Sequence, residues 1–126
     1  MAQPATGSQP DLIEFAPLAQ SDLAAIYTYT AQQWGQAQAD KYMKFLEEIL
    51  LDLVSDPTQA ALLTNPRGVT SHTAKRQGAR HGHRMFFEQT EMGIYVLRIL
   101  HTARNWREAL PESIKRLNIK HQAARK

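Results

Sequence analysis

Arginine is the residue type in this 126-residue chain whose clustering could do chemistry. Residues 67–107 contain eight basic side chains, seven of them arginine, against two acidic ones, which gives this segment a net charge of +6. Residues 1–66 contain eight acidic and two basic side chains, a net charge of −6, and residues 108–126 add +3. Because a guanidinium group forms paired hydrogen bonds with phosphate or carboxylate, the basic segment suits a polyanion or an acidic protein segment. The alternative is that these arginines are solvated or neutralise the acidic half of the chain.

The five histidines are a second candidate set, for metal binding or for acid–base chemistry. His81 and His83 are two positions apart, a spacing that puts both on one face of a strand. No nearby carboxylate completes a metal site, and no spacing relates His72 or His101 to this pair, so we predict no metal. His101 could act as a general acid or base because histidine titrates near neutral pH, although a structural histidine is the simpler interpretation.

The reactive groups that the sequence lacks narrow the chemistry further. There is no cysteine, which excludes disulfides, thiolate metal sites and a cysteine nucleophile. There is no phosphate-binding glycine loop and no convincing serine–histidine–aspartate or paired-carboxylate arrangement, so we assign no catalytic residue and no cofactor. No apolar run approaches the roughly 20 residues of a membrane span, and residues 1–10 lack the pattern of a secretory signal. We therefore expect a cytoplasmic protein that makes no membrane contact.

The acidic half of the chain has the pattern of two amphipathic helices. The first helix is predicted to begin at Ser21, with Ser21 and Asp22 as N-terminal caps, and to end at Gly35. The second is predicted to end at Asp56–Pro57, because proline prevents its continuation. Their expected core-facing residues are Leu23, Ile26, Tyr27, Thr30 and Trp34 in the first helix and Ala39, Tyr42, Phe45, Leu46, Ile49 and Leu53 in the second. Since the helices are joined almost directly, they should form an antiparallel hairpin.

The other segments carry the signals of β structure. Residues 12–15 suit a first strand at the margin of a sheet, residues 83–88 and 94–101 should form a β-hairpin, and residues 74–81 are expected to hold a further strand. The pleat of the strand 94–101 divides its side chains into Tyr95, Leu97, Ile99 and His101 on one face and Ile94, Val96, Arg98 and Leu100 on the other. With the helices on one face of the sheet, Arg98 is expected to reach the opposite face. The element order predicts an α+β fold with a largely antiparallel sheet.

Motifs in both halves, taken in order, resemble one bacterial protein family. Residues 22–30 (DLAAIYTYT), 33–35 (QWG) and 39–42 (ADKY) resemble the helical hairpin of ParE-type toxins of type II toxin–antitoxin systems, in the RelE/ParE superfamily. Asp56–Pro57 falls where that family commonly ends its second helix. Residues 82–87 (GHRMFF), 93–101 (GIYVLRILH) and 104–106 (RNW) resemble the closing strands of the family. The resemblance covers residues 11–107.

The resemblance implies a fold, a domain layout and a function. The fold would be RelE/ParE-like, with an N-terminal helical hairpin packed on a small curved antiparallel sheet. Residues 1–10 would be a flexible tail, residues 11–107 the toxin domain, and residues 108–126 a basic C-terminal extension whose pattern allows a short helix. The implied protein is a toxin that inhibits DNA gyrase by binding rather than by catalysis and so blocks replication. A cognate ParD-like antitoxin would neutralise it in a hetero-oligomeric complex, and no direct sequence-specific binding of nucleic acid is expected.

Two alternatives to gyrase inhibition stay open. RelE-type relatives cleave messenger RNA on the ribosome, and Arg98 matches a position where those nucleases use an arginine. No tyrosine follows Tyr95, however, and Glu88 stands where related sequences often carry a basic residue, so His101 or His121 would have to be the acid–base group. The other alternative is a non-toxic binding module of the same fold.

The resemblance also selects residues for contact with the two partners. For inhibition of the target the candidates are Arg98, Arg104 and Trp106, with the segment from Trp106 onward setting target specificity. Arg98 could instead form a salt bridge that shapes the concave face of the sheet. The antitoxin should be acidic where it meets the basic surface. Its expected contacts are exposed residues of the two helices together with Arg76, Arg80 and Arg84.

Overall fold

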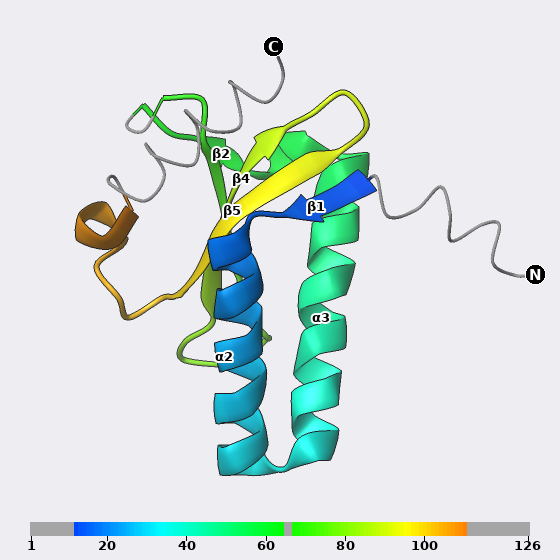
Figure 1. Ribbon diagram of the computed structural model, residues 1–126, viewed down its shortest axis with the longest axis vertical. Coiled ribbons are helices and arrows are strands. Elements are labelled where there is room, and N and C mark those ends of the chain that lie inside the picture. Colours follow the sequence, from blue (N-terminus) through cyan, green and yellow to red (C-terminus); the bar gives the residue numbers. More distant parts are fainter. Residues whose placement is uncertain (1–11, 65–66, 111–126) are drawn as a thin grey trace, which may run out of the picture.

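The chain folds into a five-stranded sheet with a helical hairpin on one face, as the computed structural model of residues 12–64 and 67–110 shows (Figure 1). Its elements are β1 (Ile13–Phe15), α2 (Pro17–Trp34), α3 (Gln36–Ser55), the short helix η2 (Pro57–Gln59), β2 (Ala61–Leu62), β3 (Thr70–Ala74), β4 (His83–Gln89) and β5 (Ile94–His101). A helical turn at residues 106–110 packs on the face of the sheet away from α2 and α3. The α+β fold and the antiparallel helical hairpin expected from the sequence are confirmed.

The sheet has the strand order β1-β5-β4-β3-β2, and β1 lies at its margin as predicted. The pairings are antiparallel except for that of β1 with β5, which run parallel with Ile13 opposite Ile94. The sheet is thus mixed rather than wholly antiparallel. Parallel neighbours require a long connection, and the two helices and the later strands provide it between β1 and β5. Gly93 permits this pairing, since a Cβ there would lie 1.9 Å from the carbonyl oxygen of Leu12.

The start of the first helix differs from the prediction, whereas both helix ends agree with it. α2 begins at Pro17, four residues before Ser21. Proline is well suited to the first turn of a helix, because backbone N–H groups there have no partner within the helix and proline, which has no N–H, loses no hydrogen bond. Ser21 and Asp22 are therefore helical residues and not caps. Gly35, with a φ of +94°, separates α2 from α3, and α3 ends at Ser55, just before Asp56–Pro57.

The main core lies between the hairpin and the sheet, and most of the predicted stripe residues contribute to it. Ile26, Ala39, Leu46 and Leu53 are buried, as is Leu50, which the predicted stripe omitted. Trp34 was expected to face the core, but 71% of it is exposed. The prediction was wrong there because the last turns of α2 extend beyond the sheet, as Figure 1 shows, so the sheet does not cover the indole.

A β-bulge in β5 changes which residues share a face. Phe86 pairs with Arg98 and Phe87 with Val96, which leaves Leu97 as the additional residue in β5. Ile99 therefore packs in the core under the helices together with Val96, whereas Leu97 packs on the opposite face. The strict alternation predicted for residues 94–101 fails at this point, and Arg98 reaches α2 instead of the far face.

The strand before β4 also differs from the prediction. β3 spans Thr70–Ala74, whereas the sequence placed this strand within residues 74–81, which form the connection to β4. The segment TSHTA carries almost no apolar alternation, and its buried Thr70 and Ser71 are polar, so its sequence gave no strand signal.

Some features that the sequence predicts lie outside the described residues. They are the tail at residues 1–10, the helix after Pro111, and the side chain of His121. Leu110, which follows the expected end of the toxin domain, is fully buried against the sheet. In the part of the chain that is described, no helix has both the length and the apolar character needed to cross a membrane.

Candidate functional site

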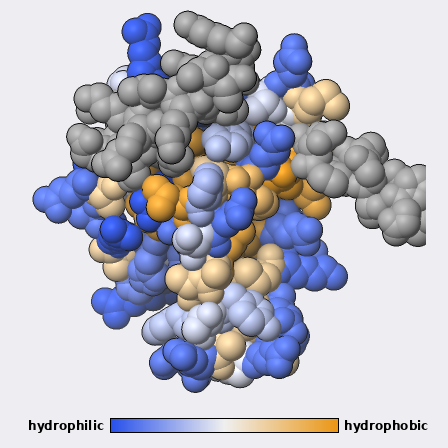
Figure 2. Space-filling model, in the orientation of Figure 1, coloured by the Kyte–Doolittle hydropathy of each residue, from blue (hydrophilic) through white to orange (hydrophobic). Residues whose placement is uncertain are grey.

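An apolar groove runs along the hairpin near β1. Its volume is about 820 Å³, and charged residues of both signs, Asp40, Lys44 and Glu47, contribute to its lining. Figure 2 shows apolar colouring over the middle of the hairpin on this face. An amphipathic protein segment can bind in such a groove by burying its apolar side. The apolar lining residues are Ile13, Phe15, Leu23, Met43, Leu46, Leu50 and Leu51.

Arg98 forms a nearly buried ion pair with Asp22 of α2. Its Nε donates to Oδ2 of Asp22 at 2.8 Å and its Nη2 to Oδ1 at 3.0 Å, while the backbone N–H of Ile99 also donates to Oδ2 at 2.9 Å. The side chains are only 11% and 15% exposed. The salt bridge that the sequence offered as one of two roles for Arg98 is therefore present, and it joins α2 to the bulged part of β5.

The three arginines selected for the antitoxin do not form one surface. Arg76 follows β3 and lies over two aromatic rings of α3, with its Cζ 5.5 Å from the ring centre of Tyr42 and 5.3 Å from that of Phe45. Arg80 is exposed in the connection between β3 and β4. Arg84 lies on the other side of the sheet, against Trp106. The structure thus distributes these charges around the domain.

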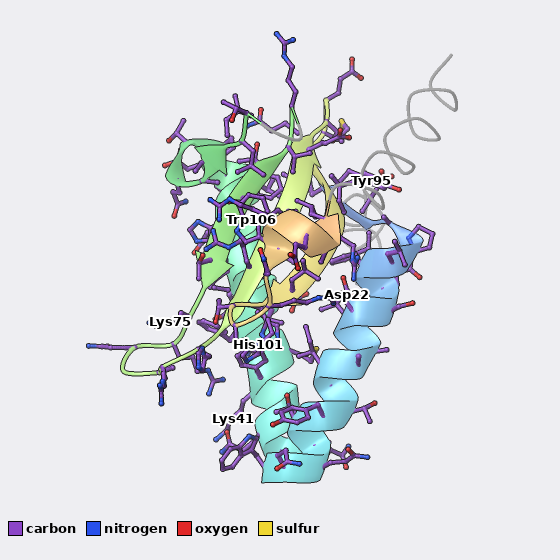
Figure 3. The ribbon with its side chains drawn as sticks, turned by 90° about the vertical axis from the view of Figure 1, so that its left-hand side faces the viewer. Asp22, Lys41, Lys75, Tyr95, His101 and Trp106 are labelled. Atoms are coloured by element: carbon purple, nitrogen blue, oxygen red, sulfur yellow. The ribbon has the colours of Figure 1, made fainter. Side chains whose placement is uncertain are left out.

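Trp106 is the centre of a cationic and aromatic cluster on the sheet face away from the hairpin. Its ring lies 5.4 Å from that of Phe86, and the Cζ atoms of Arg107 and Arg84 lie 4.4 and 5.9 Å from the indole centre. Figure 3 shows Trp106 in front of the sheet, on the helical turn. Arg104 is not in this cluster, because it lines a second pocket near the end of β5. The three target candidates therefore occupy three different environments.

The second pocket brings together three histidines that sequence reasoning had not joined. His83 lies opposite His101 in the β4–β5 pairing, their ring centres are 5.4 Å apart, and that of His81 is 5.2 Å from that of His101. The hydroxyl of Tyr42 lies 2.7 Å from Nδ1 of His83. The predicted β-hairpin of residues 83–88 and 94–101 could have indicated this cluster, because the first residue of one strand of a hairpin lies opposite the last residue of the other. Tyr42 comes from α3 and gave no signal beyond its place in a core stripe.

Burial governs the protonation of the innermost pair in this pocket. It lowers the pKa of His83 to about 4, with a further lowering by nearby His101 that Asp22 opposes. Burial also raises the pKa of Tyr42 to about 12, against the effect of Arg76. His83 is therefore neutral and Tyr42 protonated at pH 7. Among residues 12–64 and 67–110, no group of three or more histidine, aspartate or glutamate side chains is arranged to hold a metal ion.

Comparisons with known proteins identify relatives of the chain. The model of the family described as ParE toxin of type II toxin-antitoxin system, parDE, matches residues 13–106. Among solved structures, a chain of the chromosomal ParDE toxin–antitoxin system from P. aeruginosa is 25% identical, with a TM-score of 0.57. That match covers 71% of this chain and 92% of the other. No curated protein matches the chain.

Proposed function

The chain belongs to the ParE toxin family of type II toxin–antitoxin systems, and from this we propose that it is a toxin that inhibits DNA gyrase and is neutralised by a cognate ParD-like antitoxin. The observation that carries the antitoxin part is the apolar groove of about 820 Å³ between β1, α2 and α3. The toxin would act in the cytoplasm, where gyrase and the chromosome are.

The groove supports binding of an amphipathic segment of the antitoxin. Leu51, at its margin, is 41% exposed, and an apolar side chain of a partner could cover it. Lys44 of α3 lines the groove, and Arg76, which follows β3, packs over aromatic residues of α3, so acidic residues of the antitoxin would find a cation on this helix and another packed against it. Arg80 and Arg84 remain proposals as more distant contacts.

Gyrase inhibition would result from binding one state of the gyrase cycle more tightly than the others, which is how a ligand shifts a conformational equilibrium. The cluster of Arg84, Trp106 and Arg107 supports such an interface, because tryptophan and arginine dominate binding energy in protein complexes. Arg104 is a second candidate contact. For Arg98 we propose a positioning role, since its guanidinium group is held by Asp22.

The packing of the sheet favours binding over cleavage of RNA. On the face away from the hairpin, Phe86, Leu97 and Leu100 are buried in a cluster with Leu110 and Trp106. The arginines on this face, Arg84 and Arg107, lie over the indole of Trp106. Arg98, the residue that matches a nuclease position, is engaged with a carboxylate.

Two assays with the purified, antitoxin-free protein test the toxin activity. We expect loss of gyrase supercoiling with accumulation of linear plasmid DNA, and intact messenger RNA in a ribosome-dependent cleavage assay. Cut RNA with normal supercoiling would contradict gyrase inhibition and favour the nuclease. Two negative results would refute both and leave a binding module.

A charge placed in the groove tests the antitoxin part separately. Leu51→Glu should weaken antitoxin binding at least tenfold and leave gyrase inhibition intact, because a buried carboxylate without a partner opposes binding. Leu62→Glu is the matched control, since Leu62 is 71% exposed on β2 and does not line the groove. Equal antitoxin affinity for the two variants would refute the groove as the binding site.

A further inference from the structure

The pocket with the three histidines is a separate site from the antitoxin groove and the Trp106 cluster. Its volume is about 390 Å³, and it lies where β4 begins and β5 ends, with one side formed by α2 and α3. His81, His83, His101 and Arg104 line it on the sheet side. Figure 3 shows His101 in this position, below Trp106 and toward the helices. Volumes of this size are in the lower range of small-molecule sites.

A hydrogen bond from the backbone fixes the tautomer of His101. Its Nδ1 accepts from the backbone N–H of Ala103 at 3.1 Å, and a backbone N–H can only donate. A neutral imidazole that accepts at Nδ1 carries its proton at Nε2, so His101 presents an Nε2–H donor. Nδ1 of His83 lies 2.7 Å from the hydroxyl of Tyr42, and His83 presents the same donor when that hydroxyl donates to it.

The third histidine has a hydroxyl as its partner. The hydroxyl of Thr102 accepts from the backbone N–H of Gly82 at 3.1 Å, and its own hydrogen can donate to Nδ1 of His81, 3.4 Å away. This contact is longer than the other two, and with the hydroxyl as donor it leaves the proton of His81 on Nε2. Three adjacent imidazole rings, each able to present an Nε2–H donor, thus line one pocket.

The pocket has more donors than acceptors. Arg104 adds a guanidinium group, which only donates. Asp22 is the carboxylate in the lining, and its two oxygens are engaged by Arg98 and the N–H of Ile99. A metal ion does not satisfy this arrangement, because His101 holds a proton on the nitrogen that would have to bind it. An oxyanion does, since each of its oxygens accepts hydrogen bonds.

We propose that this pocket binds the phosphate group of a small phosphorylated ligand, with His81, His83, His101 and Arg104 as the donors. Tyr29 also lines the pocket and is 62% exposed, so its ring offers a flat surface beside the phosphate for an attached base or other planar group. Both free phosphate and a nucleoside monophosphate present this chemistry. The site shares no lining residue with the antitoxin groove, and Arg104 is the residue that it has in common with the candidate contacts for gyrase.

Titration of the full-length protein with three probes tests the proposal, with the imidazole signals followed by NMR. Inorganic phosphate and adenosine monophosphate should both shift the signals of His81 and His101, and adenosine should not. Tighter binding of the monophosphate identifies a nucleotide site to which Tyr29 contributes, whereas equal affinities identify a site for phosphate alone. Charge-assisted hydrogen bonds from these groups should give a dissociation constant of about 10 mM or below. The proposal is overturned if neither phosphate probe shifts the signals at about 10 mM.

Two matched pairs of variants localise the binding. Arg104→Ala and His101→Ala should each weaken phosphate binding by about 10- to 100-fold, the loss of one charge-assisted or well-placed hydrogen bond. Arg67→Ala and His72→Ala, which remove the same residue types outside the pocket, should bind as the unmodified protein does. The nitrogen chemical shifts of His101 in the free protein give an independent check. Unchanged affinity in the pocket variants, or a proton on Nδ1 of His101, overturns the proposal.

Discussion

Removing the carboxylate of Asp22 should destabilise the domain more than removing any exposed acidic group of the hairpin. In Asp22→Ala the guanidinium of Arg98 loses both of its hydrogen bonds to that carboxylate, and the N–H of Ile99 loses its acceptor. These groups join α2 to β5 at the bulge, across 76 positions of sequence. The variant therefore weakens the contact between the hairpin and the sheet rather than a local turn.

The magnitude follows from the burial of the pair. Breaking a buried ion pair by removing one partner costs about 3–5 kcal/mol, and the lower end applies because 11% and 15% of the two side chains stay exposed. A loss of about 3 kcal/mol is a large part of the usual stability of about 5–15 kcal/mol and should lower Tm by more than about 10 °C. Asp40→Ala is the matched control. It removes an exposed hydrogen bond to Tyr27 and should cost less than about 1 kcal/mol.

Urea denaturation of the single variants Asp22→Leu and Arg98→Met and of their double variant measures the coupling between Asp22 and Arg98. Asp22→Leu with Arg98→Met replaces the pair by apolar groups and should recover all but about 1–2 kcal/mol, the cost of the Ile99 N–H left without an acceptor. If Asp22→Ala cost no more than Asp40→Ala, or if the effects of the single variants simply added, the ion pair would not be a stabilising contact. The double variant also tests the role of Arg98, because a positioning residue can be replaced without loss of the proposed gyrase inhibition.

Three further predictions concern other contacts. The pKa of His83 is about 4 in the folded protein and near 6.5 in the unfolded chain, so the unfolded chain takes up the proton first as the pH falls. Lowering the pH from 7 to 5 should therefore cost the unmodified protein about 1 kcal/mol more stability than it costs His83→Gln, after allowance for the partial exposure of the ring. Equal pH dependence of the two proteins in urea denaturation would contradict this. Gly93→Ala should cost more than about 2 kcal/mol, because its Cβ would collide with the backbone of Leu12, and a loss of less than about 1 kcal/mol would refute the contact. Trp106→Ala should cost about 2 kcal/mol and impair the proposed gyrase inhibition, whereas Trp34→Ala, at a site 71% exposed, should cost no more than about 0.5 kcal/mol. Similar losses in thermal denaturation would show that the Trp106 cluster contributes nothing to stability.

Local signals predicted the parts of the fold that depend on single residues. Gly35 ends α2 because its positive φ is open to glycine, and Pro57 limits α3 because it cannot continue a helix. The bounds of β5 were also predicted, since an apolar β-branched run after Gly93 is a strong strand signal. Each of these helix ends and strand bounds depends on the sequence of only a few neighbouring residues.

The parts that sequence could not predict depend on contacts between distant segments. The extra residue Leu97 becomes a bulge only in register with β4, and that bulge sends Arg98 to Asp22. The same register places His83 opposite His101, so the candidate phosphate site requires the hairpin pairing as well as a tyrosine from α3. Periodicity along one segment contains no information on these neighbours.

The parallel pairing of β1 with β5 sets the order in which this chain can mature during synthesis. β1 has β5 as its neighbour in the sheet, so the first strand must wait for residues 94–96 to leave the ribosome before it can be held in place. Ile13 and Phe15 of β1 also form part of the apolar groove. The groove is thus completed last, and a nascent or truncated chain that ends before β5 would offer the proposed antitoxin an incomplete surface. Partner recognition would then act as a check that synthesis is complete, because contacts so distant in sequence form late in folding.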